Sequence, residues 1–205
     1  MKRSPGPSML AGRDGMEPAA GETESGDRGA EEQRAGAVEG CPPVVPRSEW
    51  GARPPRLSES MQVPAALVVI HHTALSPGHT HPACCAQLRD IQQLHMDECG
   101  WNDIGYNFLI GQDGTVYEGR GWGVEGAHTR MFNNAALGIA LMGCFTDLAP
   151  SQEALSSARR LLCCGVSLGY LLPAFTLKGH RDLGSTQCPG DMLHSSIQQW
   201  ESYRP

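Results

Sequence analysis

The chain alternates short, uninterrupted apolar runs with longer segments in which apolar residues recur at helical spacing. The runs over residues 65–70 and 137–142 have the length and composition of buried strands. Between them, the Asp-Gly pair at 113–114 is a strong hairpin signal, which joins an expected strand over 106–110 to a returning one over 115–117. Strands that alternate with helices are typical of the α/β class, so the sequence predicts a central mixed β-sheet.

About three helices are expected to flank this sheet. They cover residues 83–98, 150–168 and 191–200. In the first of them, Leu88, Ile91 and Leu94 fall on one face, which predicts an amphipathic helix packed on the sheet. A short strand over 175–178 lies between the last two helices and ends just before His180.

Charge and hydropathy exclude two classes of function. The 205 residues carry a formal net charge of −6 and contain no basic block, whereas a nucleic-acid surface needs clustered Lys and Arg. No segment approaches the roughly 20 apolar residues that span a bilayer. We therefore expect neither a nucleic-acid partner nor a membrane span.

Residues 1–40 differ in composition from the rest of the chain. Gly, Ala, Glu, Ser, Pro and Arg dominate there and no aromatic residue occurs, so the sequence predicts a disordered acidic tail before a folded domain over 41–205. The basic start is followed only by the short apolar stretch 9–11, and a secretory signal needs roughly 7–15 apolar residues. The expectation is a chain without a classical export signal, either cytoplasmic or secreted without a leader.

Three residues carry most of the chemical information. His71 follows the apolar run 65–70, His180 lies in a Gly-His-Arg-Asp segment, and Cys188 precedes Pro-Gly. Two imidazoles and a thiolate suit zinc, and three protein ligands leave a fourth position open, as in hydrolytic sites. Each residue alone has other interpretations: a histidine at a strand end is more often a hydrogen-bonded structural residue, and the cysteine alone could be a free thiol, half of a disulfide or a ligand.

Seven short motifs over residues 41–205 occur together in one order. They are Val-Pro-Arg-Ser-Glu-Trp-Gly at 45–51, Ile-His-His-Thr-Ala at 70–74, Gly-Trp-Asn-Asp-Ile-Gly-Tyr-Asn-Phe at 100–108, Asp-Gly-Thr-Val-Tyr-Glu-Gly-Arg-Gly-Trp at 113–122, Gly-Ala-His at 126–128, Gly-His-Arg at 179–181 and Cys-Pro-Gly at 188–190. Each motif is weak alone, but the combination resembles the peptidoglycan recognition proteins, animal relatives of phage lysozymes of the amidase type. The resemblance implies the type 2 amidase fold.

The family that the chain resembles contains zinc amidases and metal-free binders. The resemblance to the amidases extends to all three ligand positions, which implies Zn²⁺ on His71, His180 and Cys188, with His71 rather than His72 as the ligand of the His-His pair. It implies cleavage of the amide bond between N-acetylmuramic acid and L-alanine in bacterial peptidoglycan, in innate immune defence. Cys188, as a ligand, and Tyr106, which matches the catalytic tyrosine of the amidases, are the expected catalytic residues.

A substrate groove is also implied by the resemblance. Its expected lining residues are His72, Thr73, His95, Gly100, Trp101, Tyr106, His128 and Asn133. His95 follows Leu94 on the first helix and is expected at the groove edge rather than in the core. The Gly100–Trp101 pair matches family members that favour diaminopimelate-type stem peptides. Arg120 and Trp122 are open to two interpretations, glycan contact or capping of the hairpin.

The sequence departs from the family pattern at two places. Thr186 stands where the phage enzymes have a catalytic lysine, which puts a cationic partner of the reaction in doubt. A cysteine pair usually flanks the loop after His-Thr-Ala in the family, but here Gly78 stands near the first position, and Cys84 and Cys85 are left without that partner. Cys41 and Cys164 match a second pair of the family, which implies a disulfide in an oxidising compartment.

Two rival functions make different predictions. A non-catalytic module that binds peptidoglycan as a pattern-recognition protein predicts a damaged ligand triad, and here the triad is complete. A structural zinc domain predicts a fourth Cys or His ligand close to the other three. His72 and Cys144 are the only candidates for that fourth ligand, and neither fits the family pattern.

Overall fold

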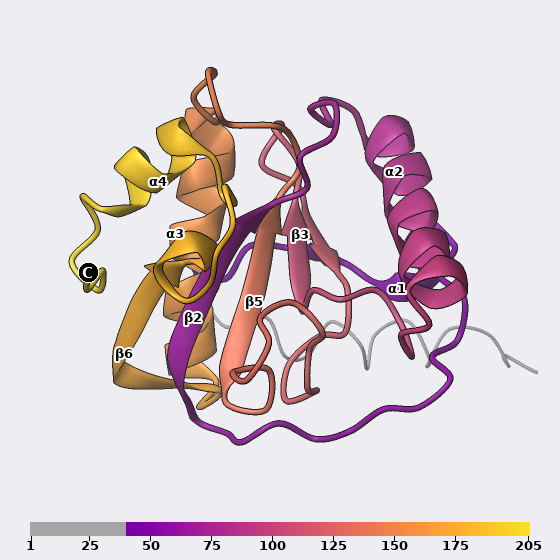
Figure 1. The fold of residues 1–205 in the computed structure, drawn as a ribbon, viewed down its shortest axis with the longest axis horizontal. Coiled ribbons are helices and arrows are strands. Elements are labelled where there is room, and N and C mark those ends of the chain that lie inside the picture. The colour runs from indigo at the N-terminus through magenta and orange to yellow at the C-terminus, as the bar shows by residue number, and fades with distance from the viewer. Residues whose placement is uncertain (1–39) are drawn as a thin grey trace, which may run out of the picture. The chain divides into compact units, whose positions relative to one another are not determined.

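The computed structural model describes residues 40–205 and contains a six-stranded mixed sheet (Figure 1). The predicted disordered tail lies, up to residue 39, outside the described residues. The strands are β1 (Val44–Val45), β2 (Ala65–His72), β3 (Phe108–Ile110), β4 (Val116–Glu118), β5 (Ala136–Leu141) and β6 (Leu171–Gly179), in the order β1-β4-β3-β5-β2-β6. The expected hairpin β3–β4 is the antiparallel pair, and the other paired strands are parallel. The predicted α/β class with a mixed sheet is confirmed.

Helices cover both faces of the sheet (Figure 1). They are α1 (Arg47–Trp50), α2 (His81–Gln93), α3 (Gln152–Ser167) and α4 (Asp191–Ile197), with a π-helical turn at Leu94–Glu98 and a 3₁₀ turn at His180–Asp182. The three expected helices correspond to α2, α3 and α4. The four-residue α1 and the two-residue β1 were not predicted, because elements this short carry no periodicity.

Alternation along the strands divides the core into two layers. Phe108 and Ile110 of β3 pack in the cluster beneath α3 and α4, whereas Leu109 between them packs in the cluster beneath α1 and α2. In β2, Ile70 belongs to the α3 layer, so the side chain of the next residue, His71, points to the other face. The opposite faces of one strand thus serve packing and chemistry.

The end of the first long helix departs from the prediction. Leu94 was expected to face the sheet, but it is exposed, and His95 and Met96 are buried instead. The residues from Leu94 to Glu98 form a π-helical turn, which is wider than an α-turn and shifts the inward-facing positions by one residue. His95 is therefore buried, which corrects its expected place at the groove edge. Gly100 then adopts φ +72°, a left-handed conformation that favours glycine, and the chain turns toward Trp101.

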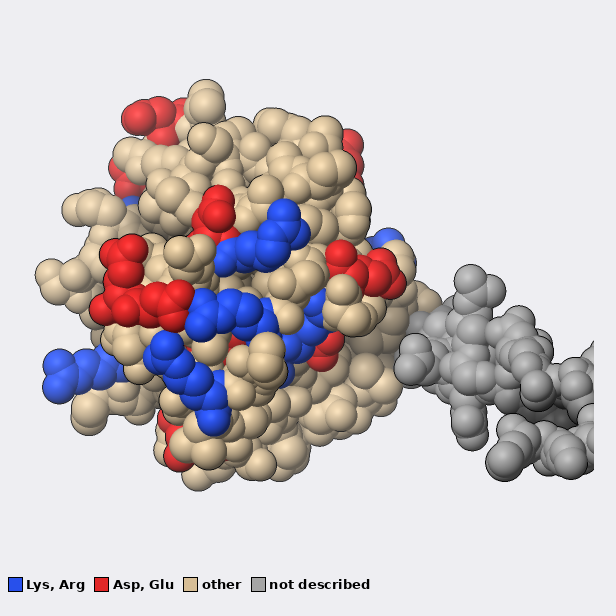
Figure 2. Space-filling model, turned by 90° about the vertical axis from the view of Figure 1, so that its right-hand side faces the viewer, with Lys and Arg blue, Asp and Glu red and all other residues tan. Residues whose placement is uncertain are grey.

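The start of the described chain is attached to α3. Cys41 forms a disulfide with Cys164 of that helix, and Arg160, one turn earlier, donates to the carbonyl oxygens of Gly40 and Cys41. On the α1 and α2 side, basic side chains lie beside acidic ones rather than forming an uninterrupted patch (Figure 2). Arg53 and Arg56, for example, both pair with Asp97. No helix among residues 40–205 has the length and apolarity needed to cross a membrane.

Candidate metal centre

The parallel register of two strands brings two histidines together. Ile70 of β2 lies beside Gly179 of β6, and both strands run in the same direction. The residues that follow, His71 on β2 and His180 in the 3₁₀ turn directly after β6, therefore lie at the same edge of the sheet, and their ring centroids are 4.6 Å apart. The carboxyl ends of parallel strands are where sites of α/β folds gather.

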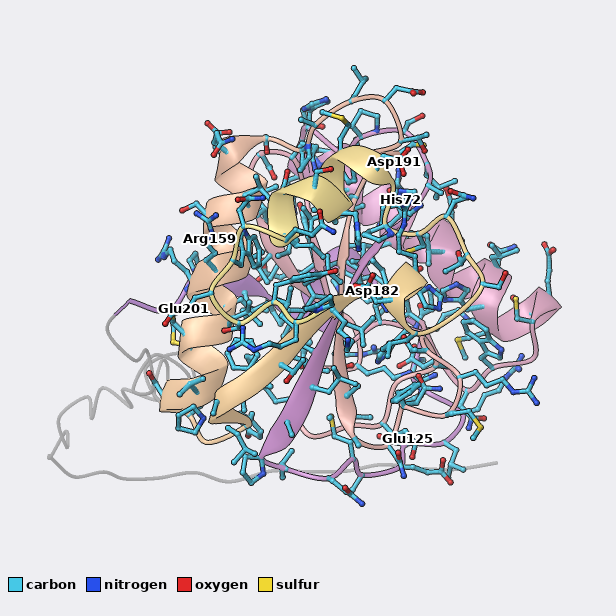
Figure 3. All side chains as sticks on the ribbon, turned by 60° about the vertical axis from the view of Figure 1, so that its left-hand side comes forward. His72, Glu125, Arg159, Asp182, Asp191 and Glu201 are labelled. Atoms are coloured by element: carbon cyan, nitrogen blue, oxygen red, sulfur yellow. A yellow bond between two sulfur atoms is a disulfide. The ribbon has the colours of Figure 1, made fainter. Side chains whose placement is uncertain are left out.

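Cys188 reaches the same place through a tightly bonded loop between β6 and α4. Arg181 makes three contacts across this loop: its backbone N–H donates to the Cys188 carbonyl, and its guanidinium donates to the Gln187 carbonyl and pairs with Asp191 at 2.6 Å. Figure 3 shows Asp182 and Asp191 coming from the 3₁₀ turn and from the start of α4. The Thr186 hydroxyl accepts from the Cys188 N–H, so Thr186 shapes the turn that presents the thiol.

The three predicted ligand residues form one compact group. One ligand atom from each of His71, His180 and Cys188 lies within 4.8 Å of the others, and Cys188 Sγ is 3.6 Å from His71 Nδ1. This is the one cluster of at least three His, Cys, Asp or Glu side chains within residues 40–205 that could hold a metal ion. Two imidazole nitrogens and a thiolate are donors that suit zinc.

The proposed alternative ligands are engaged elsewhere. His72 Nδ1 accepts from the Phe145 N–H at 3.3 Å, on the opposite side of the strand from His71. Cys144 is exposed and contacts the hydroxyl of Thr146. Neither joins the ligand group, so the described chain offers three protein ligands and not the closed set of four that a structural zinc site needs.

Burial sets the protonation of the cluster. Burial lowers the pKa of His71 well below its ordinary value, with smaller contributions from His128, His180 and His72, and it also lowers the pKa of His180. Burial raises the pKa of the Cys188 thiol to about 11, an effect that the His72 N–H and Arg181 partly oppose. Both rings are therefore neutral and ready to ligate at neutral pH, whereas the thiol needs a cation beside it to lose its proton.

Tyr106 lies beside the ligand group. Its ring lies 5.3 Å from the His71 ring, and burial, followed by the neighbouring Cys188, raises the pKa of its hydroxyl. Tyr106 is therefore protonated at neutral pH and able to donate a hydrogen bond. It borders a cavity of about 440 Å³ that also contacts all three ligand residues.

The cavity lining includes some of the predicted groove residues and not others. His72, Thr73, Trp101, Tyr106 and His128 line it, together with Ala74, Ala127, Thr186 and Gln187. His95 lies behind the wall, where its Nδ1 accepts from the Gly105 N–H and its ring packs 4.5 Å from Trp101. Asn133 also lies outside the lining, and its Oδ1 accepts from the N–H groups of His128 and Thr129.

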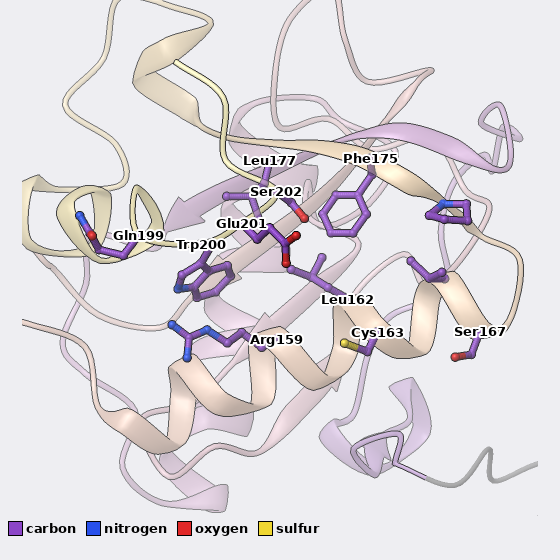
Figure 4. Close-up of a pocket in the computed structure, with 12 residues that line it drawn as sticks. Arg159, Leu162, Cys163, Ser167, Phe175, Leu177, Gln199, Trp200, Glu201 and Ser202 are labelled. Atoms are coloured by element: carbon purple, nitrogen blue, oxygen red, sulfur yellow. The ribbon is translucent and has the colours of Figure 1, made fainter.

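A larger cavity, of about 600 Å³, lies elsewhere in the molecule (Figure 4). It is bounded by α3, β6 and the C-terminal segment, and Leu162, Phe175 and Trp200 give it an apolar wall. None of the predicted site residues lines it. Size therefore does not identify the chemical site, whereas the grouped ligand atoms do.

Comparisons with known proteins agree with this geometry. Residues 61–191 match the family model Amidase_2, N-acetylmuramoyl-L-alanine amidase. The chain is 48% identical to peptidoglycan recognition protein 1 of Mus musculus over 170 residues, which are 82% of this chain and 93% of the mouse protein. It is 44% identical over 168 residues to an N-acetylmuramoyl-L-alanine amidase of Sus scrofa, which covers 80% of this chain but 28% of that larger protein.

The fold is also that of a solved relative. Peptidoglycan recognition protein LE, crystallised with tracheal cytotoxin, a monomeric diaminopimelic acid-type peptidoglycan, superposes with a TM-score of 0.78. The sequences are 41% identical, and the match covers 78% of this chain and 95% of the other. The chain thus belongs to the N-acetylmuramoyl-L-alanine amidase family and, within it, to the peptidoglycan recognition proteins.

Proposed function

We propose that this protein is a zinc-dependent N-acetylmuramoyl-L-alanine amidase that hydrolyses bacterial peptidoglycan in innate immune defence. The observation that carries the proposal is the ligand group: His71, His180 and Cys188 converge within 4.8 Å beside a cavity that Tyr106 borders. The donor set fits zinc, and the absence of a fourth protein ligand among residues 40–205 leaves a coordination position for water or substrate. Bound zinc would supply a Lewis acid and an activated water at neutral pH.

The reaction is hydrolysis of one amide. The C–N bond between the lactyl carbonyl of N-acetylmuramic acid and the amino group of L-alanine breaks. Water supplies the oxygen that stays on the carbonyl carbon and the proton that leaves with the amine. The products are a muramic acid carboxylate and a free stem peptide.

Tyr106 would stabilise the charge that develops during this reaction. Its hydroxyl stays protonated at neutral pH because burial raises its pKa, so it can donate to the carbonyl oxygen or the leaving nitrogen. The nearby walls would orient the substrate: Trp101, about one-third exposed, offers an aromatic face, and Thr73 offers a hydroxyl. Thr186 does not supply a cation here, since its side chain is a neutral hydroxyl, which accepts from the Cys188 N–H.

Peptidoglycan fragments are the substrate class that the relatives support. Peptidoglycan recognition protein LE was crystallised with a diaminopimelic acid-type fragment, and the Sus scrofa relative is named for the amidase reaction. A preference for diaminopimelate stems would also follow from Gly100 and Trp101, whose turn places the indole at the cavity. The second candidate function is peptidoglycan binding without cleavage, which the name of the mouse relative favours.

Release of free stem peptide from purified peptidoglycan, followed by mass spectrometry, tests the proposal. Cleavage should stop with a chelator, return with Zn²⁺ and be lost in Cys188→Ala. Cys144→Ala is the matched control, because Cys144 is an exposed free cysteine outside the ligand group. Cleavage by Cys188→Ala equal to wild type would overturn the metal assignment, and wild type that binds but never cleaves would establish the binding function instead.

A further inference from the structure

His71 makes contacts on both sides of its ring. Its Nδ1 faces Cys188 Sγ at 3.6 Å, whereas Nε2 points the other way, 3.1 Å from His128 Nδ1 and 3.3 Å from the hydroxyl of Thr129. The hydroxyl is also 2.9 Å from His128 Nδ1, so the three polar atoms form a closed triangle. His71 and His128 are both buried, so these contacts are not exchanged for water.

The direction of the hydrogen bonds is set at the far end of His128. His128 Nε2 lies 3.2 Å from the carbonyl oxygen of Ala136, which can only accept. His128 Nε2 therefore carries the proton, and Nδ1 of the neutral ring is an acceptor. His128 Nδ1 needs a donor, which is the N–H of His71 Nε2 either directly or through the Thr129 hydroxyl. Either route puts the His71 proton on Nε2 and leaves the lone pair of Nδ1 toward Cys188.

The fold holds the His128 ring in one place. A Cβ atom at Gly126 or at Gly138 would lie 2.3 Å from Cδ2 of His128, so the ring fits where it does only because both of these positions are glycine. The backbone is fixed as well, because Asn133 Oδ1 accepts from the N–H groups of both His128 and Thr129.

We propose that His128 and Thr129 are positioning residues that hold His71 in the Nε2–H tautomer and so reserve Nδ1 for the metal. The proposal rests on the zinc function above and deepens it. It also changes the role of His128: both of its ring nitrogens are already bonded, so it is not a hydrogen-bonding contact of the substrate, although its ring borders the cavity. Fixing a ligand tautomer from behind is a common means of strengthening a metal site.

The test compares three variants with wild type. His128→Phe keeps a ring but removes both nitrogens, His128→Asn keeps an acceptor close to the position of Nδ1, and Thr129→Val removes the hydroxyl. The first readout is the imidazole ¹⁵N spectrum of the metal-free protein, which reports the tautomer of His71. The second is the Zn²⁺ dissociation constant, measured by competition with a chelator.

Wild type should show a protonated Nε2 and a bare Nδ1 on His71. His128→Phe should lose this pattern and bind Zn²⁺ about 10- to 100-fold more weakly, while His128→Asn should recover most of the affinity. A wild-type proton on Nδ1, or an unchanged tautomer and unchanged zinc affinity in His128→Phe, would overturn the proposal. If His128→Phe does not fold, the His71 tautomer in wild type and the zinc affinities of His128→Asn and Thr129→Val test the proposal in its place. Failure of wild type to bind Zn²⁺ while His71 keeps the Nε2 proton would instead count against the amidase function.

Discussion

Ile70 and Gly179 lie side by side in the parallel pair β2–β6, one residue before the two histidines of the candidate metal centre. This register has a chemical consequence, because a shift of one residue in β2 would turn His71 to the other face, and a shift in β6 would displace the 3₁₀ turn that carries His180. The packing of Ile70 in the α3 layer opposes such a shift. The hydrophobic core thus fixes the relative position of two ligands that are far apart in the sequence.

Replacement of Tyr106 by Phe should separate catalysis from metal binding. The ring would still fill its place beside His71, but the hydroxyl that donates to the developing charge would be lost. Loss of one such donor lowers kcat by about 10²- to 10³-fold. We expect this loss on soluble muropeptides, with little change in zinc affinity. A Tyr106→Phe enzyme with full kcat would remove Tyr106 from the reaction.

Zinc affinity should rise with pH, by at least about tenfold per pH unit between about pH 7 and 8, because the thiol releases one proton and zinc-bound water can release another. Burial raises the pKa of Cys188 to about 11, so the thiol keeps its proton over this range and releases it only when metal binds. Burial lowers the pKa of His71 and His180 below the ordinary value for histidine, so both rings are mainly neutral above pH 7 and release few protons when metal binds. The affinity must therefore increase as protons become scarcer and level off only above the pKa of the thiol.

Chelator competition at several pH values measures this slope. Cys188→Ser is the matched control, since a neutral hydroxyl releases no proton on binding, so the affinity should be weaker and its slope with pH smaller by about one proton. Wild-type affinity that does not vary with pH would show that Cys188 is not bound as a thiolate.

The parts of this site that the sequence predicted depend on residues close together in the chain, and the parts that it missed depend on contacts between residues far apart. The strand before His71 and the hairpin at 113–114 follow local patterns, and the sequence predicted both. The contact of His71 with His128 joins residues 57 apart, and no local pattern encodes it. Thr129 was missed as its partner for the same reason, and the one available signal was its place directly after a predicted site histidine.

The prediction that His95 lies at the groove edge was wrong for a different reason. Helical periodicity assumes 3.6 residues per turn, and at Leu94 the chain adopts a wider turn that no spacing rule anticipates. The resemblance to a family placed His95 near the groove, but only the packing against Trp101 and the bond from Gly105 show that it supports the wall from behind.

Asp182 should be needed to hold His180 in place. Its carboxylate accepts from the Gly179 N–H at 2.8 Å, from His194 Nε2 at 2.8 Å and from the Tyr203 hydroxyl at 3.2 Å, and so ties the 3₁₀ turn to α4 and the C-terminal segment. In Asp182→Ala these largely buried donors lose their acceptor, at about 1–3 kcal/mol of unfolding free energy.

The same variant should bind zinc about tenfold more weakly, because the turn that carries His180 is less constrained. Denaturant unfolding and chelator competition measure the two effects. Asp90→Ala is the comparison variant, since it removes an exposed carboxylate from α2, which carries none of the three ligand residues. Equal effects of the two substitutions on zinc affinity would show that the buried contacts of Asp182 have no special role.

A disulfide can be introduced where the family usually has one. A Cβ atom built on Gly78 lies 2.5 Å from Sγ of Cys84, and Gly78 has backbone angles that other residues can adopt. Gly78→Cys should therefore bridge to Cys84 in oxidising buffer after a small rotation of the Cys84 side chain. Closing this short loop should add about 2 kcal/mol to the free energy of unfolding.

The reduced form of the variant should be less stable than wild type, because the added side chain then collides with a fully buried thiol. Denaturant unfolding with and without reductant measures both forms. Wild type under the same two conditions corrects for reduction of the Cys41–Cys164 disulfide, and Gly78→Ala reports the collision alone. If Gly78→Cys gained no more stability on oxidation than wild type does, the loop between the two residues would not hold them at bonding distance in solution.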